Sequence, residues 1–243
     1  MARMGIIGSK GRMGGALVRA IEEAGHSHAG GVDQGDDVST LAAASDCLID
    51  FSAPAALAGN LAAAHTGGAA ILIGTTGLDE THFAAIENAA QNGAVLQTGN
   101  TSLGVNLLSH LVETAAAKLG ADWDLEILEM HHRHKVDAPS GTAKLLGEAA
   151  ARGRGIDLAA NMDSGRDGIT GARKEGSIGF AALRGGSVAG DHSVILAGEQ
   201  ERITLSHQAE DRMIFARGAV KAAAWLIGKD AGRYTMGDVL GLD

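Results

Sequence analysis

The sequence predicts an α/β fold in which a parallel-sheet domain is joined to a second α+β domain with a mixed or antiparallel sheet. Apolar residues make up 45% of the 243 residues, enough for a substantial core. In the first hundred residues, short apolar runs alternate with segments of helical periodicity, which is typical of a parallel sheet with crossover helices. From residue 177 onward, short strand-like runs follow one another across glycine turns, which indicates antiparallel or mixed pairing.

The first half of the chain supplies the predicted parallel sheet. We expect strands at residues 3–7, 29–32, 47–51, 69–73 and 94–97, and helices at residues 13–24, 55–65 and 80–92. Ligands of such sheets bind beyond the carboxyl ends of the strands. Small or polar residues follow these strands, so a binding edge is predicted there.

A glycine-rich turn directly follows the first strand. Gly8, Gly11 and Gly14 have the spacing GxxGxxG between a strand and a helix, the context of a Rossmann-like dinucleotide site. Gly8 permits a tight turn, Gly11 lets the backbone approach a pyrophosphate, and Gly14 lets helix and strand pack closely. Asp33 ends the second strand, about 20 residues after Gly14, where an acid is expected to bind the adenosine ribose.

The nucleotide preference is left open by the residues of this region. An acid at Asp33 disfavours the 2′-phosphate of NADP, and Gln34 beside it is neutral. Lys10 and Arg12 can nevertheless meet a phosphate. We therefore expect NADH and/or NADPH, with NADH somewhat favoured by Asp33 and Gln34.

The second half begins a new sheet and ends by returning to the first. Helices are expected at residues 105–119, 142–152 and 212–227, strands at 124–130, 177–184, 187–189, 191–197 and 202–208, and a polar surface loop at 161–176. The apolar face of the last helix suits packing against the first sheet. We therefore expect one domain of residues 1–102 and 212–243 and a second of residues 103–211.

A basic segment, His131-His132-Arg133-His134-Lys135, follows the strand at 124–130 in a chain of net charge -9. Histidine and lysine clustered together are poised to give a proton or to hold an anion. Ser140, Gly141 and Thr142 resemble the N-terminus of a helix, whose free N–H groups bind carboxylate or phosphate. A small anion is the favoured ligand. A zinc site and a plain surface loop are the alternatives, although neither H-E-x-x-H nor a cysteine partner is present.

Composition limits the partners and the compartment. The excess of 29 Asp and Glu over 20 Lys and Arg argues against a nucleic-acid partner. No apolar run approaches the ~18–20 residues that span a bilayer, and no secretory leader precedes the first strand. The single cysteine, Cys47, excludes an internal disulfide and reads as a buried small hydrophobe. We expect a cytoplasmic protein.

Several motifs resemble one enzyme family nearly from end to end. They are Gly8–Gly14, Gly74-Thr75-Thr76-Gly77, Gly99-Asn100 with 102–106, the long run 129–143, Arg212-Met213 with Phe215 and 218–220, and 238–240. Together they resemble the 4-hydroxy-tetrahydrodipicolinate reductase (dihydrodipicolinate reductase) family of lysine biosynthesis. The run 129–143 is highly specific, whereas the glycine turn alone is not.

The resemblance implies an NAD(P)H-dependent reduction of a cyclic dicarboxylate with loss of water. It implies that His131 is the acid/base histidine, that Lys135 is the proton donor, and that His132, Gly141 and Thr142 bind substrate. It assigns the cofactor to Gly8, Ser9, Lys10, Gly11, Arg12, Met13, Asp33, Gly74, Thr75, Thr76, Thr98, Gly99, Asn100 and Thr101. It also implies a dinucleotide-binding domain at 1–102 and 212–243, a substrate-binding and oligomerisation domain at 103–211, and a homotetramer built through the second sheet.

The chain departs from the family pattern at three places beside the cofactor. Thr101 stands where an aromatic residue is frequent, and the segment 34–46 is shorter than in many relatives. Gln34 replaces the arginine that some members use for the NADP phosphate. Two other functions remain open: a different Rossmann-type dehydrogenase acting on an amino or oxo diacid, and a non-catalytic NAD(P)-binding sensor. The long His-Lys run argues against the first.

Overall fold

The computed structural model describes residues 1–242 and divides the chain into two compact units. Unit 1 consists of Met1–Leu103 together with the residues from Met213 onward, and unit 2 consists of Gly104–Arg212. Among residues 1–242, no helix is both long and apolar enough to cross a membrane.

Unit 1 contains a six-stranded sheet in which every pairing is parallel, as predicted. Its strands are β1 (Arg3–Ile7), β2 (Ser27–Val32), β3 (Cys47–Asp50), β4 (Ala70–Ile73), β5 (Ala94–Gln97) and β11 (Gly232–Tyr234). Their order is β11-β5-β4-β3-β1-β2, so the direction of winding reverses between β1 and β3. Loops that follow these two strands therefore flank the crevice where such sheets bind ligands.

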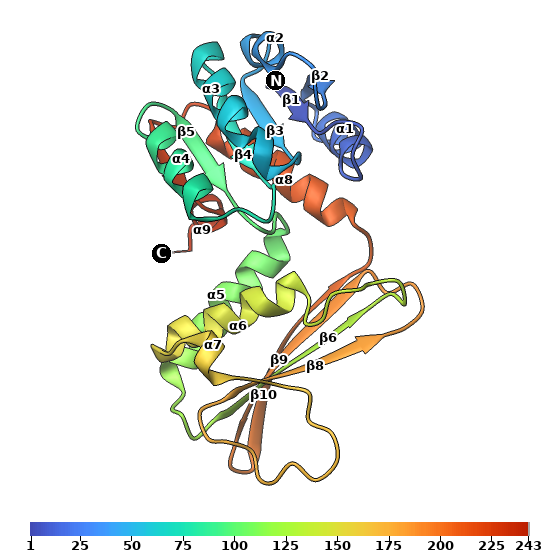
Figure 1. The fold of residues 1–243 in the computed structure, drawn as a ribbon, viewed down its shortest axis with the longest axis vertical. Helices are drawn as coiled ribbons and strands as arrows, with labels where there is room; N and C mark the ends of the chain where they lie inside the picture. The colour runs from blue at the N-terminus through green and yellow to red at the C-terminus, as the bar shows by residue number, and fades with distance from the viewer. Residues whose placement is uncertain (243) are drawn as a thin grey trace. The chain divides into compact units, whose positions relative to one another are not determined.

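Helices cover both faces of this sheet (Figure 1). They are α1 (Gly14–Glu23), α2 (Val38–Ala43), the 3₁₀-helix η1 (Pro54–Ala56), α3 (Leu57–Gly67), α4 (Glu80–Ala90), α8 (Met213–Leu226) and α9 (Met236–Leu240). Side chains of α1 and α8 form one hydrophobic cluster with the sheet, and those of α2, α3 and α4 form the other. Successive strand residues point to opposite faces, so Ile6 and Ile7 fall into different clusters.

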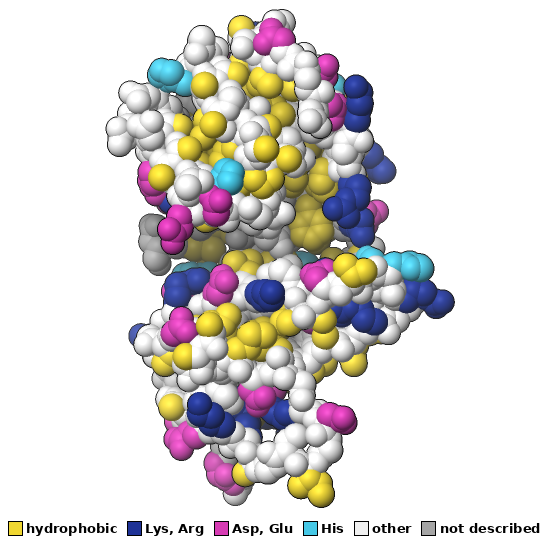
Figure 2. Space-filling view, in the orientation of Figure 1, with side chains coloured by type: hydrophobic (Ala, Val, Ile, Leu, Met, Phe, Trp, Pro, Cys, Tyr) yellow, Lys and Arg dark blue, Asp and Glu magenta, His cyan; other side chains and the backbone are white. Residues whose placement is uncertain are grey.

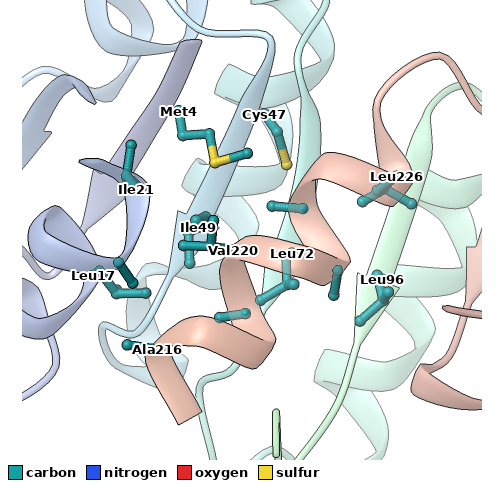
Figure 3. Close-up of a cluster of buried hydrophobic side chains, with 14 of the residues drawn as sticks. Met4, Leu17, Ile21, Cys47, Ile49, Leu72, Leu96, Ala216, Val220 and Leu226 are labelled. Carbon is teal, nitrogen blue, oxygen red and sulfur yellow. The ribbon is translucent and has the colours of Figure 1, made fainter. Parts of the chain in front are cut away.

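Helix α8 fills the centre of the first cluster, as expected for a C-terminal helix that returns to this sheet. Figure 3 shows Ala216, Val220 and Leu226 of α8 facing strand residues such as Ile49 and Leu72. Cys47 lies fully buried in the same cluster, and burial raises the pKa of its thiol to about 12. The cysteine is therefore a small hydrophobic core residue, as predicted.

Three short elements of unit 1 were not predicted. Helix α2 has six residues, strand β11 three and helix α9 five. None of the three contains enough apolar residues for a helical or strand periodicity to be recognised in the sequence. Strand β11 forms at the sheet edge because its backbone pairs with β5, not because its side chains indicate a strand.

Unit 2 contains a mixed five-stranded sheet, which confirms the predicted second sheet. Its strands are β6 (Asp124–His131), β7 (Met162–Ser164), β8 (Ile178–Arg184), β9 (Gly190–Gly198) and β10 (Glu201–Ala209), in the order β10-β9-β6-β8-β7. Strand β9 pairs antiparallel with β6 and β10, whereas β6, β8 and β7 run parallel.

Two of the helices, α5 (Leu103–Lys118) and α6 (Gly141–Arg154), pack on one face of this sheet around a third hydrophobic cluster. A short helix, α7 (Leu158–Asn161), follows α6. On the opposite face Leu128 and Met130 are half-buried, and Leu183 is 48% exposed.

Two expectations for unit 2 were wrong. Residues 187–189 do not form a strand, because the carbonyls of Gly186 and Val188 accept hydrogen bonds from Arg133 and His132 and the segment is a turn between β8 and β9. Within the expected loop at 161–176, residues 162–164 form strand β7, which pairs parallel with β8. Neither pairing is visible from local sequence.

Candidate active site

The basic segment 131–135 begins at the last residue of β6, where regular strand pairing gives way to a turn. Burial alternates strictly along β6: Leu125, Ile127, Glu129 and His131 are buried, and the residues between them are half-exposed. Glu129 and His131 therefore lie on the core face of the strand, two positions apart. The strand is therefore fully buried on one face only.

Glu129 is the centre of a buried polar network. Its side chain is 0% exposed, and Oε2 lies 2.6 Å from Nδ1 of His131. Arg184 donates to both carboxylate oxygens at 2.8 Å, and the backbone N–H of Ser140 donates to Oε1 at 3.2 Å. Burial acts to raise the pKa of Glu129, but the hydrogen bonds from Arg184 and His131 outweigh it and hold that pKa below its usual value.

A second histidine, His192, closes the other side of this network. It stands opposite Glu129 in the β6–β9 ladder, and its ring meets the ring of His131 edge-on at 5.1 Å between centroids. Its Nε2 lies 3.0 Å from Oγ of Ser140. Burial, aided by the neighbouring His131, lowers the pKa of His192 to about 4, so the ring is neutral at pH 7.

Ser140 connects this network to helix α6. Its Oγ accepts a hydrogen bond from the backbone N–H of Ala143 and so caps the helix N-terminus. Gly141, the first helical residue, is exposed, and Thr142 is half-buried. The predicted helix mouth at residues 140–142 is therefore present, beside the carboxylate that contacts His131.

His132 is half-buried in unit 2 and lies next to the guanidinium of Arg212. Arg212 donates to its Nε2 at 3.3 Å, and its Nδ1 finds no hydrogen-bond partner among residues 1–242. Partial burial, followed by the charge of Arg212, lowers the pKa of His132 below its ordinary value. The imidazole is thus held neutral beside a guanidinium, which leaves it able to share an anion with Arg212.

Lys135 forms an ion pair with the carboxylate of Asp137. Its Nζ lies 2.8 Å from Oδ1 of Asp137, and its side chain is 20% exposed. His131 and Lys135 therefore each have a carboxylate partner of their own, so the basic segment is not a group of unpaired cations. Figure 2 shows basic and histidine side chains gathered on unit 2 at the end toward which β6 and β8 run.

The predicted nucleotide residues of unit 1 gather at the carboxyl edge of its sheet. The loop between β1 and α1 is tightly folded: a Cβ added to Gly14 would lie 1.7 Å from the carbonyl oxygen of Ser9, and one added to Gly8 would lie 2.6 Å from that of Phe51. Helix α1 begins without a side-chain cap, so its N-terminal N–H groups suit an anionic ligand. Lys10, Gly11 and Arg12 are exposed, whereas Met13 packs against the core.

Asp33 follows β2 and braces this loop. It accepts a hydrogen bond from Oγ of Ser9 at 2.6 Å and from the backbone N–H of Lys10 at 3.1 Å. The bond from Ser9 is the main cause that lowers the pKa of Asp33 below its usual value. The predicted ribose acceptor is therefore ionised and already joined to the glycine loop.

The loops after β4 and β5 complete the edge. Gly74 and Thr75 are buried, and Thr76 is exposed. Thr98 and Asn100 are joined by two hydrogen bonds, from Oγ1 of Thr98 to the carbonyl of Asn100 and from the N–H of Asn100 to that Oγ1; Gly99 between them is exposed.

Thr101 is buried, unlike the three residues that precede it. It is 2% exposed, and its Oγ1 donates to the carbonyl of Phe215 at 2.7 Å. Gly218 makes this contact possible, because a Cβ there would lie 1.8 Å from the carbonyl oxygen of Thr101. The side chain of Thr101 thus fastens the loop after β5 to α8.

Sequence reasoning missed the buried groups behind both sets of predicted residues. In unit 1, the fully buried Asp50 accepts hydrogen bonds from Ser52, Asn60 and Thr75. In unit 2, Glu129, Arg184 and His192 were not singled out. Glu129 could have been found from the sequence, because an acid two positions before a histidine in a strand lies on the same face as that histidine. Arg184 and His192 could not, because they reach Glu129 only through the pairing register of β8 and β9 with β6.

These features define a class of protein. A parallel sheet that reverses direction beside a glycine turn, with an acid after the second strand, is the arrangement of a dinucleotide-dependent oxidoreductase. Among residues 1–242, no group of His, Cys, Asp and Glu is arranged to hold a metal ion.

Comparisons with known proteins identify the family. Residues 2–101 match the family described as dihydrodipicolinate reductase, N-terminus, and residues 104–240 match dihydrodipicolinate reductase, C-terminus. The chain therefore belongs to the dihydrodipicolinate reductase family. It is 55% identical to a 4-hydroxy-tetrahydrodipicolinate reductase of Zymomonas mobilis and 51% identical to one of Rhodopseudomonas palustris, with 99% of this chain and 97% of each relative covered.

Solved structures agree on the fold. A dipicolinate-bound dihydrodipicolinate reductase from Paenisporosarcina sp. TG-14 has a TM-score of 0.77 at 22% identity, with 97% of each chain covered. A probable dehydrogenase from Thermotoga maritima has a TM-score of 0.60 at 12% identity, covering 98% of this chain and 92% of that one.

Proposed function

We propose that the chain reduces 4-hydroxy-2,3,4,5-tetrahydrodipicolinate to 2,3,4,5-tetrahydrodipicolinate with loss of water, using NADH or NADPH, in lysine (diaminopimelate) biosynthesis. The observation that carries the proposal is that His131, in the same basic segment as Lys135, shares the Glu129 carboxylate with the backbone N–H of Ser140 at the start of α6. Relatives at 51–55% identity that bear the reductase name support the same reaction.

In this proposal unit 1 is the dinucleotide-binding domain. The glycine loop from Gly8 to Met13 and the N-terminus of α1 hold the pyrophosphate, and Asp33 holds the adenosine ribose. The loops at 74–76 and 98–101 hold the other half of the nucleotide. The tight loop geometry and the uncapped helix fit such a ligand. When bound, the nucleotide supplies the hydride.

Unit 2 is the substrate-binding domain in this proposal. The substrate carries two carboxylates, which suit the N–H groups at Gly141 and Thr142 and the neighbouring His132. The guanidinium of Arg212 beside the neutral His132 supports an anion site there, because the arginine contributes a positive charge that the imidazole does not neutralise.

Lys135 supplies the proton of the reaction. Loss of the 4-hydroxyl and a proton from the adjacent carbon, as water, gives a conjugated imine. A hydride then adds to the carbon that carried the hydroxyl, and negative charge develops on the adjacent carbon. Protonation by the Lys135 ammonium neutralises that charge, so this residue acts in the transition state rather than in binding alone. His131 acts as an acid/base group beside it.

Two further properties belong to this proposal. We infer a homotetramer built through the sheet of unit 2, which is supported by Leu128, Met130 and the 48% exposed Leu183 on the face opposite the helices. Light scattering of wild type and Leu183→Glu tests it, since the charge is expected to dissociate the assembly. A cytoplasmic location is supported by the single buried cysteine.

The decisive experiment follows NADH oxidation with enzymatically generated substrate and is repeated with NADPH. Oxidation that depends on the substrate supports the proposal. NADH binding without turnover would instead indicate a sensor, and oxidation only with another amino or oxo diacid would indicate a different dehydrogenase.

A further inference from the structure

The Glu129 carboxylate contacts two different parts of the proposed site at once. One oxygen, Oε2, faces Nδ1 of His131, and the other, Oε1, accepts the backbone N–H of Ser140 at the start of α6. A single buried group thus joins the acid/base histidine to the helix mouth.

The same contact determines which nitrogen of His131 carries a proton. The hydrogen bonds from Arg184 hold Glu129 ionised, and an ionised carboxylate can only accept. Nδ1 of His131 must therefore be the donor, which leaves Nε2 as the nitrogen that exchanges protons. Gly190 keeps space at Nε2, because a Cβ there would lie only 3.0 Å from it.

We propose that Glu129 is a positioning residue that fixes the tautomer and orientation of His131 and, through Ser140, the place of the α6 N-terminus relative to it. This inference rests on the proposed function, in which His131 is the acid/base group. Glu129 itself is buried and touches no substrate.

Two neighbours make this arrangement rigid. Arg184 stands opposite His131 in the β6–β8 ladder and binds both oxygens of Glu129, so the carboxylate cannot rotate freely. On the other side, His192 packs edge-on against His131 and reaches Oγ of Ser140. Glu129, His131, His192 and Ser140 thus form a closed ring of contacts.

The test uses Glu129→Gln, which keeps the size of the side chain but removes its charge. The new amide can donate to Nδ1 and so favours the opposite tautomer. We expect kcat to fall by about 10-fold or more, with the Kd for NADH unchanged within about twofold. A purely structural residue would change the two together or only lower the Tm.

The chain offers a matched control on the same strand. Glu126 also accepts hydrogen bonds from arginines, Arg166 and Arg173, but among residues 1–242 it shares no hydrogen bond with a histidine. Glu126→Gln therefore removes a comparable ionic network. We expect it to leave kcat within about twofold of wild type.

A second readout does not depend on activity. Nitrogen-15 NMR of histidine-labelled protein distinguishes the Nδ1–H from the Nε2–H tautomer, and a His131→Asn sample assigns the His131 signal among the 10 histidines. We expect Nδ1–H in wild type and loss of that preference in Glu129→Gln. Because the wild-type spectrum is informative by itself, the inference remains testable even if the variant does not fold.

The outcomes separate this inference from the proposed function. An Nε2–H tautomer in wild type, or equal kcat in wild type and Glu129→Gln, would overturn the positioning role while reductase activity stood. A wild-type protein that never oxidises NADH with substrate would overturn the proposed function, whatever the tautomer.

Discussion

Oγ of Ser140 lies 3.0 Å from Nε2 of His192, so the residue that caps α6 is also bonded to a buried histidine on β9. Because that histidine is 4% exposed, its protonation would place a charge inside the core of unit 2. The contact makes the helix mouth sensitive to acid.

The first prediction concerns acid stability. In the folded chain the pKa of His192 is about 4, below the ordinary 6.5, so the unfolded chain binds the extra proton between these values. This group therefore leaves the stability unchanged above about pH 6.5 and lowers it by up to ~3 kcal/mol as the pH falls from 6.5 toward 4. His192→Gln should show a correspondingly smaller fall in unfolding free energy over this range, measured by urea titration. An unchanged slope would contradict the prediction.

The second prediction concerns Lys135. In Lys135→Ala we expect kcat to fall by about 100-fold or more, because the proton donor is removed, while the Kd for NADH stays near the wild-type value. Steady-state kinetics and a fluorescence titration measure the two quantities. Lys144→Ala, an exposed lysine on α6, is the control and should behave as wild type. Normal turnover in the first variant would remove the lysine from the mechanism.

The third prediction concerns Asp33. We expect Asp33→Ala to weaken NADH binding by about 10-fold, since a ribose acceptor is lost and Ser9 and Lys10 lose their brace. NADPH binding should be less affected, because the acid opposes its 2′-phosphate. Calorimetric titration with both nucleotides measures the difference.

Asp46→Asn is the control for that experiment. Asp46 binds Arg3 where β3 begins, at the opposite edge of the same sheet, and its loss should change neither affinity. Equal weakening of both nucleotides by Asp33→Ala would refute the ribose assignment.

The fourth prediction compares two adjacent glycines. In Gly14→Ala the new methyl group would overlap the carbonyl oxygen of Ser9, so the glycine loop must shift; we expect a loss of ~1–3 kcal/mol in stability and weaker NADH binding. Gly15→Ala meets nothing within 4 Å and should be neutral or stabilising by ~0.5–1 kcal/mol. Thermal unfolding and NADH titration of both variants test this difference. Equal stability and equal NADH affinity of the two variants would show that the loop between β1 and α1 is less tightly folded than the structure indicates.

Much of the fold was predictable because its signals are local. The apolar runs at β1, β3, β4 and β5 are short and each is followed by a small or polar turn, so their positions were predicted to within one residue at each end. The turn at residues 187–189 was misread because its carbonyls pair with a segment more than fifty residues earlier in the chain. Such pairing leaves no local pattern.

The candidate site was predictable only in part, for the same reason. The basic segment at 131–135 and the helix mouth at 140–142 are contiguous and chemically distinctive. Glu129, Arg184 and His192 meet only because β8 and β9 flank β6 in one particular register. No local pattern determines that register, so the partners that orient His131 could not be inferred before the structure.

The order in which the chain is synthesised has a consequence for how the two units fold. All of unit 2 lies within Gly104–Arg212, whereas the hydrophobic cluster of unit 1 needs α8, whose last residue is Leu226. A growing polypeptide therefore carries β1, β3 and β4 with one face covered only by α1 while the whole of unit 2 emerges from the ribosome. The later unit can complete its core first, and the sheet of unit 1 must remain protected from aggregation until translation is almost finished.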